Sequence, residues 1–481
     1  MSTRSPHIVW FRRDLRVRDN PALTAACADG GPVLAVYVHS PRDAGPWGPG
    51  GASRWWLHHS LAALTSDLNR LGIPLLLLRG PTRSALLSLC SRVQARAVSW
   101  NRRYEPGSIE VDKRLKAQLA AQGVVAQSFN GSLLIEPWQI TTGVGSPYRV
   151  FTPFWRKAQT LVQAEPGLPA PEPRRNHFVV DAPGLTLESL KLLPRIPWAG
   201  GLAATWQPGE AGAHSRLERF LVESIQGYRE GRDYPQKQST SGLSPHLAFG
   251  EVSPRQVLAA VHAHWNSGMG LTPDADFFVR ELFWREFSYH LLFHFPNTPT
   301  ENLNADFDTF AWRQPDPVLL KAWQQGRTGL PIVDAGMREL WKTGTMHNRV
   351  RMLVASVLTK NLRYHWLHGA RWFWDTLVDA DLANNTQGWQ WTAGTGADAA
   401  PYFRIFNPVT QGERFDPEGG YVRRFVPELA EVPTRFIHQP WLLPPAEQAR
   451  LGLAGTPYVR PLIDLASSRT EALAAYKTRG D

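Results

Sequence analysis

The first 132 residues alternate between short apolar runs and segments in which apolar residues recur at helical spacing. Five apolar runs of strand length occur, at 8–11, 33–38, 73–78, 95–100 and 124–129. Helical spacing is found between them, at 54–71, 83–93 and 108–122. Continuous apolar runs are typical of strands that are buried on both faces. The pattern therefore predicts an α/β domain of the Rossmann-like kind, with a parallel five-stranded sheet covered by helices.

The rest of the chain divides into a connection and a helical region. Proline and glycine are frequent from 133 to 200, which indicates a long interdomain linker with one short helix near 151–162. From 201 onward, apolar stripes at helical spacing recur and strand-like runs are few. We therefore expect an α/β domain over 1–132, a linker over 133–200 and an all-α domain over 201–475.

Segment 379–408 lacks this periodicity and mixes polar side chains with large aromatic rings. It holds a pair of aspartates two positions apart, Asp379 and Asp381, an asparagine pair, and two tryptophans, Trp389 and Trp391. Such a mixture suits a flat ligand with a polar edge, because amides and carboxylates can meet the edge while rings meet the faces. A long loop whose tryptophans fill the core explains the pattern equally well. The segment alone does not choose between these interpretations.

Composition adds a basic charge and an excess of tryptophan. Lys and Arg number 52 against 42 Asp and Glu, so the net charge is +10, which favours a polyanionic partner without establishing one. The 20 tryptophans fit stacking on bases or on a cofactor, electron transfer, or simply a large aromatic core. Cys27 and Cys90 form neither a zinc pattern nor a cluster pattern. We expect reduced thiols, no metal site, no membrane span, and a cytoplasmic protein.

A glycine turn precedes one of the predicted helices. Residues 240–244 read Thr-Ser-Gly-Leu-Ser and lie between Pro235 and Pro245. Hydroxyl and backbone N–H groups at such a turn can hold phosphate. A serine that only caps a helix is the commoner arrangement, so the turn is weak evidence by itself.

Two predicted helices carry polar residues at positions i, i+3 and i+4, which share one helical face. The first face contains Glu281, Trp284 and Arg285. It can line a cleft, or it can be an Arg–Glu pair beside a core tryptophan. The second face contains Asn348, Arg351 and Met352 and can equally be a solvated arginine face.

Six motifs in this order resemble those of the photolyase/cryptochrome family, most closely the class I cyclobutane pyrimidine dimer (CPD) photolyases. They are WFRRDLRVRDNPAL, TSGLSPHLAFGE, ELFWREF, TGLPIVDAGMREL, MHNRVRM and DADLANNTQGWQW. The resemblance covers nearly the whole chain. It implies an N-terminal α/β antenna domain, a long interdomain loop, and an α-helical catalytic domain that holds FAD in a folded form.

The resemblance also implies roles for individual residues. The residues implied to bind FAD are Tyr228, Thr240, Ser241, Gly242, Leu243, Ser244, Phe278, Arg285, Arg351, Asp379, Asp381 and Asn385. The residues implied to bind DNA or its lesion are Arg232, Glu281, Trp284, Asn348, Arg349, Met352, Trp391, Arg404 and Gln411. Glu281, Asn385 and Met352 are implied to be catalytic. An electron is expected to pass from the protein surface to oxidised FAD through Trp312, Trp366 and Trp389.

The implied activity is light-driven repair of UV-damaged DNA by a monomeric carbon–carbon lyase. Reduced FAD, excited by blue or near-UV light, donates an electron to a flipped-out dimer in single- or double-stranded DNA, because the dimer must leave the base stack to reach the flavin. The first alternative is a cryptochrome-like blue-light photoreceptor with the same fold. The second is a non-enzymatic single-strand nucleic-acid binder, which leaves the Asp379 to Asn385 motif unexplained.

The sequence leaves the antenna chromophore open. A folate-type site requires an Asn-Glu pair where Gly107 and Ser108 stand. A deazaflavin-type site is matched by Arg54 and Glu105, but it requires a lysine at Ala248. A deazaflavin, a folate, another flavin or no antenna at all therefore remain as alternatives.

Overall fold

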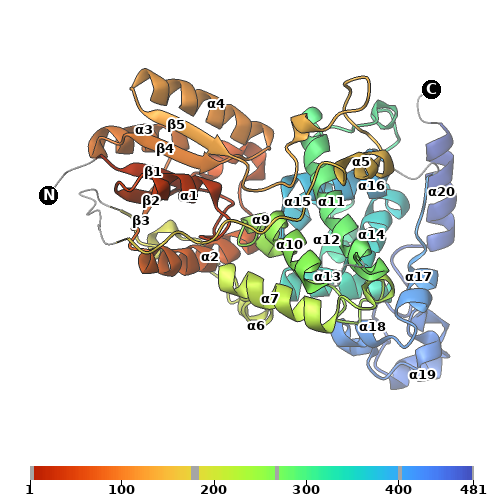
Figure 1. Cartoon of the computed structure of the whole chain (residues 1–481). Coiled ribbons are helices and arrows are strands. Elements are labelled where there is room, and N and C mark those ends of the chain that lie inside the picture. The colour runs from red at the N-terminus through yellow and green to blue at the C-terminus, as the bar shows by residue number, and fades with distance from the viewer. Residues whose placement is uncertain (1–4, 175–183, 266–269, 399–402, 479–481) are drawn as a thin grey trace. The chain divides into compact units, whose positions relative to one another are not determined.

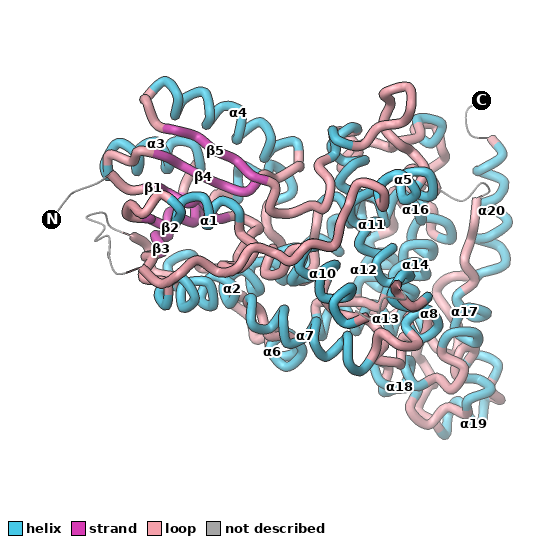
Figure 2. Tube along the Cα trace, viewed as in Figure 1, coloured by secondary structure: helices cyan, strands magenta, loops and turns pink. Residues whose placement is uncertain are grey.

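Five parallel strands form one sheet in the N-terminal part of the computed structural model (Figures 1 and 2). The strands are β1 (His7–Phe11), β2 (Val33–His39), β3 (Leu75–Arg79), β4 (Ala97–Asn101) and β5 (Val125–Phe129). Their order across the sheet is β3-β2-β1-β4-β5, and each neighbouring pair runs parallel. The predicted parallel five-stranded sheet is confirmed, and each predicted run lies within two residues of its strand.

Helices cover both faces of the sheet, as Figure 1 shows. On one face, α1 (Pro21–Ala28) and α2 (Gly51–Arg70) pack against Val9 and Phe11 of β1. On the other face, α3 (Thr82–Val93) and α4 (Pro106–Ala121) pack against Ile8 and Trp10. Because successive side chains of a strand point to opposite faces, the apolar residues Ile8–Phe11 of β1 are buried on both sides of the sheet.

Helix α1 is absent from the sequence prediction, although its start is locally encoded. The Asn20 side chain accepts a hydrogen bond from the amide of Leu23, and Pro21 occupies the first helical position. Asparagine at the cap followed by proline is a typical helix start. The helix has only eight residues, which is too short for its apolar spacing to stand out.

Helices dominate the chain after β5. Those of the same compact unit as the sheet are α5 (Phe151–Ala158), α6 (Gly200–Thr205), α7 (Glu210–Glu223), α9 (Ser244–Phe249), α10 (Pro254–His264) and α11 (Pro273–His294). The connection from 133 to 200 otherwise consists of loops and 3-10 turns in the part that the structure describes. The one short helix expected there is α5.

A second compact unit is helical. Its main helices are α12 (Pro317–Gln324), α13 (Pro331–Thr343), α14 (Asn348–Ser356), α15 (Trp366–Thr376), α17 (Pro408–Phe415), α18 (Gly420–Phe425), α19 (Pro445–Arg450) and α20 (Leu465–Lys477), and it includes most of α16 (Leu382–Ala393). Helix α14 runs directly into a π-helical turn, η5 (Val357–Asn361). Among the described residues of this unit, β-structure is limited to one isolated bridge between Arg313 and Tyr364. The predicted all-α character is confirmed.

The structure describes residues 5–174, 184–265, 270–398 and 403–478. The first unit comprises 1–226, 241–296 and 378–383, and the second comprises 227–240, 297–377 and 384–481. The chain therefore passes between the units several times. The division into 1–132, 133–200 and 201–475 remains a prediction from the sequence.

Candidate functional site

Helix α11 carries the predicted face with Glu281, Trp284 and Arg285, and Thr272 caps its start. The ring of Trp284 stacks on Phe151 of α5, with ring centroids 3.6 Å apart and an angle of 9° between the planes. One face of this indole is therefore covered by the protein, and only the other face can meet a ligand. Sequence reasoning missed Phe151, which lies more than a hundred positions away from its partner.

Arg285 and Glu286 attach α11 to the start of the connection. The guanidinium of Arg285 donates to the carbonyl oxygen of Ser132 at 2.9 Å and lies 3.3 Å from the Glu286 carboxylate. Glu286 accepts hydrogen bonds from the amides of Leu134 and Ile135 at 2.8 and 3.1 Å. Burial raises the pKa of Glu286 to about 7. This carboxyl holds a loop in place and was not among the predicted site residues.

Asp379 and Asp381 receive hydrogen bonds from two separate motifs of the first unit. The hydroxyl of Ser244 donates to Asp379 at 2.7 Å, and the hydroxyl of Tyr289 on α11 donates to Asp381. Burial, together with the charge of Asp381, raises the pKa of Tyr289 well above its ordinary value. The structure therefore brings together the glycine turn, α11 and the aspartate motif.

The glycine turn has the conformation that its sequence requires. Gly242 has φ +61°, and a Cβ there would lie 2.5 Å from the guanidinium of Arg216. Ser241 accepts a hydrogen bond from the Leu243 amide at 3.4 Å, and Ser244 begins α9. Leu243 is buried, whereas the side chains of Thr240 and Ser244 are exposed. The turn thus presents hydroxyl groups while its apolar residue joins the core.

Two further predicted FAD residues pack within aromatic surroundings. Phe278 is buried, with its ring 4.6 Å from that of Phe220. Tyr228 belongs to the second unit and is also buried, and the guanidinium of Arg232 lies 5.5 Å from the centre of its ring.

The predicted antenna residues behave differently from each other. Although burial opposes ionisation of Glu105, the neighbouring Arg103 lowers the pKa of its carboxyl to about 2. Glu105 therefore forms an ion pair with Arg103 inside the protein. Arg54 on α2 is exposed and donates to the Pro49 carbonyl at 3.3 Å. The antenna role of both residues remains a prediction.

The second unit contains most of α16, where the sequence suggested either a ligand-binding segment or a long loop. The loop interpretation is wrong, because residues Leu382–Ala393 are helical. The amide nitrogen of Asn385 donates to the Ala370 carbonyl at 3.0 Å. This bond leaves the Asn385 side-chain oxygen as the atom that can accept a hydrogen bond from a ligand. Trp391 is half-buried and donates to the Asp398 carbonyl at 3.0 Å.

The C-terminal end of α16 is held by a buried lysine. Lys360, in η5, is 1% exposed and donates to the carbonyl oxygen of Ala393 at 2.6 Å. Its ammonium also lies 3.3 Å from the centre of the Phe403 ring. A cation at the C-terminus of a helix satisfies a free carbonyl and complements the helix dipole.

The three predicted electron-transfer tryptophans lie in the second unit. Trp389 is buried, and its ring lies 4.9 Å from that of Phe373. The indole of Trp389 also packs closely against Gly369, because a Cβ at position 369 would lie 2.0 Å from it. Trp366 is fully buried and donates to Asn302 at 2.9 Å.

An imidazole links two of these tryptophans. The ring of His365 lies 5.4 Å from that of Trp366 and 5.2 Å from that of Trp312. Burial lowers the pKa of His365 to about 4, so this ring is neutral near neutral pH. His365 was not among the predicted residues, and its position beside Trp366 in sequence gives no signal of the contact with Trp312.

Helix α14 presents the MHNRVRM motif. His347 caps the helix by accepting from the Arg349 amide at 3.3 Å, so Asn348 is the first helical residue and is exposed. Arg351 donates to the Met346 carbonyl at 2.7 Å, and Met352 is half-buried.

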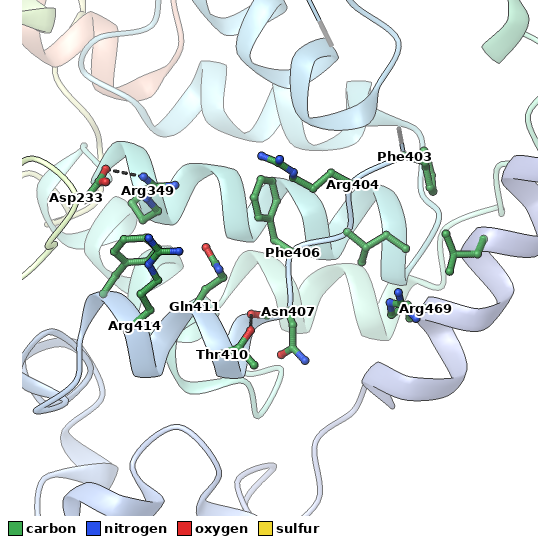
Figure 3. Close-up of a pocket in the computed structure, with 13 residues that line it drawn as sticks. Asp233, Arg349, Phe403, Arg404, Phe406, Asn407, Thr410, Gln411, Arg414 and Arg469 are labelled. Atoms are coloured by element: carbon green, nitrogen blue, oxygen red, sulfur yellow. Dashed lines mark hydrogen bonds and ion pairs between the residues drawn. The ribbon is translucent and has the colours of Figure 1, made fainter. Parts of the chain in front are cut away.

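A groove of about 590 Å³ in the second unit collects several of the predicted DNA-binding residues (Figure 3). Arg349, Arg404 and Gln411 all line it, whereas Arg232 does not. Arg349 pairs with Asp233 at 2.5 Å and lies 4.4 Å from the ring centre of Phe415. Two further arginines that the sequence reasoning missed, Arg414 and Arg469, also line the groove. Neither belongs to a recognised motif.

Comparison with known proteins assigns the family. A model of DNA photolyase matches residues 7–174, and a model described as the FAD binding domain of DNA photolyase matches residues 278–478. A deoxyribodipyrimidine photo-lyase of Agrobacterium fabrum is 49% identical, with 98% of each chain covered. The chain belongs to the photolyase/cryptochrome family. Its helical region therefore contains an FAD-binding domain of the kind found in DNA photolyase.

Two further comparisons bear on the kind of family member. Cryptochrome-2 of Arabidopsis thaliana is 39% identical, with 96% of this chain and 77% of that protein covered. The crystal structure of a bacterial class III photolyase from Agrobacterium tumefaciens has a TM-score of 0.93 and 48% identity over 98% of this chain and 97% of that one. The expected class I assignment is not supported.

No helix in the described ranges is long and apolar enough to cross a membrane. Cys27 and Cys90 are both free thiols.

Proposed function

We propose that this protein is a deoxyribodipyrimidine photo-lyase that uses light and FAD to split cyclobutane pyrimidine dimers in UV-damaged DNA. The observation that supports this most strongly is the 49% identity to a photo-lyase of Agrobacterium fabrum over nearly the full length of both chains. The similarity to a solved class III photolyase favours class III within the family. A monomeric, cytoplasmic enzyme remains a prediction, as does the type of any second chromophore.

In this proposal the polar groups around the aspartate motif bind FAD. Asp379 and Asp381 are held by Ser244 and Tyr289, so their carboxylates are positioned before a ligand arrives. Preformed hydrogen bonds reduce the ordering cost of binding. Tyr228, Phe278, Arg285, Arg351 and residues 240–244 complete the proposed set.

The Asn385 side chain suits contact with a reduced, anionic flavin. The amide nitrogen of Asn385 is used by Ala370, which leaves a neutral carbonyl oxygen for the ligand. A carboxylate at this position would repel an anionic flavin, whereas a neutral amide does not. When bound, reduced and photoexcited FAD supplies the electron that splits the dimer into two pyrimidines.

The lesion must leave the DNA stack to be repaired. Trp391 and the open face of Trp284 can stack on the flipped pyrimidines, and base–aromatic stacking contributes about 1–3 kcal/mol per base. In this proposal Glu281 hydrogen-bonds a base edge, and Asn348 and Met352 also contact the lesion. Arg232, Arg349, Arg404 and Gln411 bind the DNA backbone and supply salt-sensitive, sequence-independent affinity.

Trp389, Trp366 and Trp312 keep the cofactor in its working redox state by carrying an electron inward from the surface. The neutral ring of His365 lies against Trp366 and Trp312. Because it carries no charge near neutral pH, it does not oppose a positive charge on either indole.

The decisive experiment follows thymine absorbance in an oligothymidine that carries cyclobutane dimers, under blue light and in the dark. Recovery that requires both light and chemically reduced enzyme is expected. Bound, reducible FAD without any recovery would contradict repair and favour the photoreceptor alternative. Glu281→Gln with an unchanged repair yield would remove Glu281 from the proposed mechanism.

A further inference from the structure

The two ends of the groove in the second unit differ in charge. Figure 3 shows Arg349 and Arg414 toward one end, near Asp233, and Arg469 toward the other, with Phe406 and Gln411 between them. At the first end, Asp233 partly neutralises Arg349. At the other end, Arg469 is exposed and makes no ion pair or hydrogen bond within the described residues.

The position of Arg469 is set by its neighbour in sequence. Ser468 is buried, and its hydroxyl accepts a hydrogen bond from the Asn361 side chain at 2.8 Å, which attaches α20 to η5. Glu471, two residues beyond Arg469, forms ion pairs with Arg313 and Arg363.

Apolar contacts add to this attachment of α20. Ala472 and Ala475 of α20 pack in one cluster with Phe403 and Phe307. A helix held at several points keeps the side chains between them at a defined position. Arg469 is therefore an exposed cation on a firmly attached helix.

The same helical frame connects Arg469 to Arg349. Arg349 lies in the first turn of α14, which continues without interruption into η5 and ends at Asn361. At 1.5 Å per residue, this stretch is roughly 18 Å long. Because Asn361 bonds to the residue before Arg469, the two arginines are held apart by a distance of this order. One strand of DNA advances 3.4 Å per nucleotide, so roughly five nucleotides span this interval.

We propose that Arg469 binds a DNA phosphate about five nucleotides from the one bound at Arg349, so that the groove follows the backbone well beyond the lesion. This inference rests on the proposed repair function. The planar guanidinium suits bidentate binding of a phosphate. Thr410, Asn407 and Gln411 along the groove offer additional polar groups between its ends. Regularly spaced phosphates match two cations at a set separation better than an acidic peptide does.

The first test uses single-stranded oligonucleotides with one cyclobutane dimer, whose flanks are lengthened on either side from about two to about ten nucleotides. For the unmodified protein, affinity is expected to increase when one flank exceeds about five nucleotides. Arg469→Gln should bind the long substrates about fivefold more weakly and the short ones equally well. Lys477→Gln is the matched control, because Lys477 is exposed on the same helix but does not line the groove.

Salt provides the second readout. Loss of one phosphate contact should make the Arg469→Gln defect about threefold larger at 50 mM than at 200 mM salt. Equal affinity of Arg469→Gln and the unmodified protein for all flank lengths would overturn the proposal. So would a loss that is the same for short and long flanks, since that indicates a general change of structure. A preference of the groove for an acidic peptide over the long oligonucleotide would also overturn it.

The outcome is separable from that of the proposed function. Light-dependent repair of the shortest substrate does not involve Arg469, so Arg469→Gln should retain it in full. If the unmodified protein fails to repair that substrate, the repair function is wrong. If repair is normal while the flank dependence is missing, only the role of Arg469 is wrong.

Discussion

In the first unit, the charged and polar side chains around the aspartate motif are paired within the fold, whereas most of the arginines that line the groove of the second unit are exposed. Asp379 and Asp381 each have a hydroxyl donor, and Glu286 has two backbone donors. Arg414 and Arg469, in contrast, have no acidic partner among the described residues. Buried polar groups need hydrogen-bond partners within the fold, whereas exposed cations are hydrated and stay available to bind a ligand.

This contrast predicts how each region should respond to substitution and to salt. A buried, paired group acts through specific contacts, so its loss should be large and insensitive to salt. An exposed arginine acts through long-range charge, so its loss should be modest and decline as salt rises. The same distinction separates a site that positions one cofactor from a surface that binds a regular polymer.

The largest effect is expected at the buried Trp389. Trp389→Phe should reduce photoreduction of oxidised FAD to background, because the last indole before FAD in the proposed electron path is lost. Repair by the chemically reduced enzyme should persist, and the stability cost should be on the order of 2 kcal/mol. The measurement is the rate of FAD bleaching under blue light with an external reductant.

Trp323→Phe is the matched control for that variant. Trp323 is also fully buried, and its ring lies 6.3 Å from that of Trp389, but it is outside the proposed path. Equal photoreduction in Trp389→Phe and Trp323→Phe would show that the path does not reach FAD through Trp389.

The next largest effect is expected on the pH dependence of stability, at Glu286. Burial raises the pKa of this carboxyl to about 7 in the folded protein, above the ordinary value of 4.5 in the unfolded chain. The folded state therefore binds the proton more tightly, and the free energy of unfolding should fall as pH rises from about 4.5 to about 7, by roughly 3 kcal/mol. Glu286→Gln cannot titrate, so urea unfolding of this variant should lose less stability between about pH 5 and pH 8.

An exposed acid serves as the reference for this pH experiment. Glu223→Gln alters an exposed residue of α7 and should leave the pH dependence of the unmodified protein in place. A Glu286→Gln profile parallel to that of the unmodified protein would mean that Glu286 is already ionised at low pH in the folded state.

Asp379 should affect FAD binding more than stability. Asp379→Ala removes the carboxylate that accepts the Ser244 hydroxyl, and the affinity for FAD should fall about tenfold to hundredfold, the value of a hydrogen bond to a charged group. Ser244→Ala removes only the neutral donor and should cost about fivefold. Both values come from titrating the apoprotein with FAD. A full complement of FAD in Asp379→Ala would exclude this carboxylate from the cofactor site.

The sheet could be predicted from the sequence because its information is local. The runs HIVWF and VLAVYVH are continuous and apolar, since these strands are buried on both faces. Helix α16 could not be recognised in the same way. Its sequence, LANNTQGWQWTA, mixes polar and aromatic residues because the helix is stabilised by packing against Gly369 and Phe373 and by Lys360 at its end.

The contacts between residues far apart in the sequence, which form the candidate site, could not be predicted from any local sequence pattern. Tyr289 and Asp381 are 92 positions apart, and Glu286 lies 152 positions from Leu134. The spacing on α11 predicted which residues share a face, but not that Phe151 covers Trp284 or that Glu286 binds backbone amides. Arg469 was missed for the same reason, since nothing near it in sequence indicates that α20 lines a groove.

The smallest effect, and the one most specific to the groove, is expected at Asp233. This carboxylate pairs with Arg349 and is the acidic residue among the described residues that line the groove. Because the ion pair is partly exposed, the attraction between Asp233 and Arg349 contributes little to stability. The negative charge of Asp233 nevertheless opposes phosphate binding. Asp233→Asn should therefore strengthen binding to damaged and undamaged DNA alike by about threefold at low salt, with the gain shrinking as salt rises. Fluorescence anisotropy provides the measurement, and Glu431→Gln, an exposed acid outside the groove, should change neither affinity. Weaker binding by Asp233→Asn would mean instead that the ion pair positions Arg349 for its phosphate, and the groove would then be preorganised in the same way as Asp379 and Asp381.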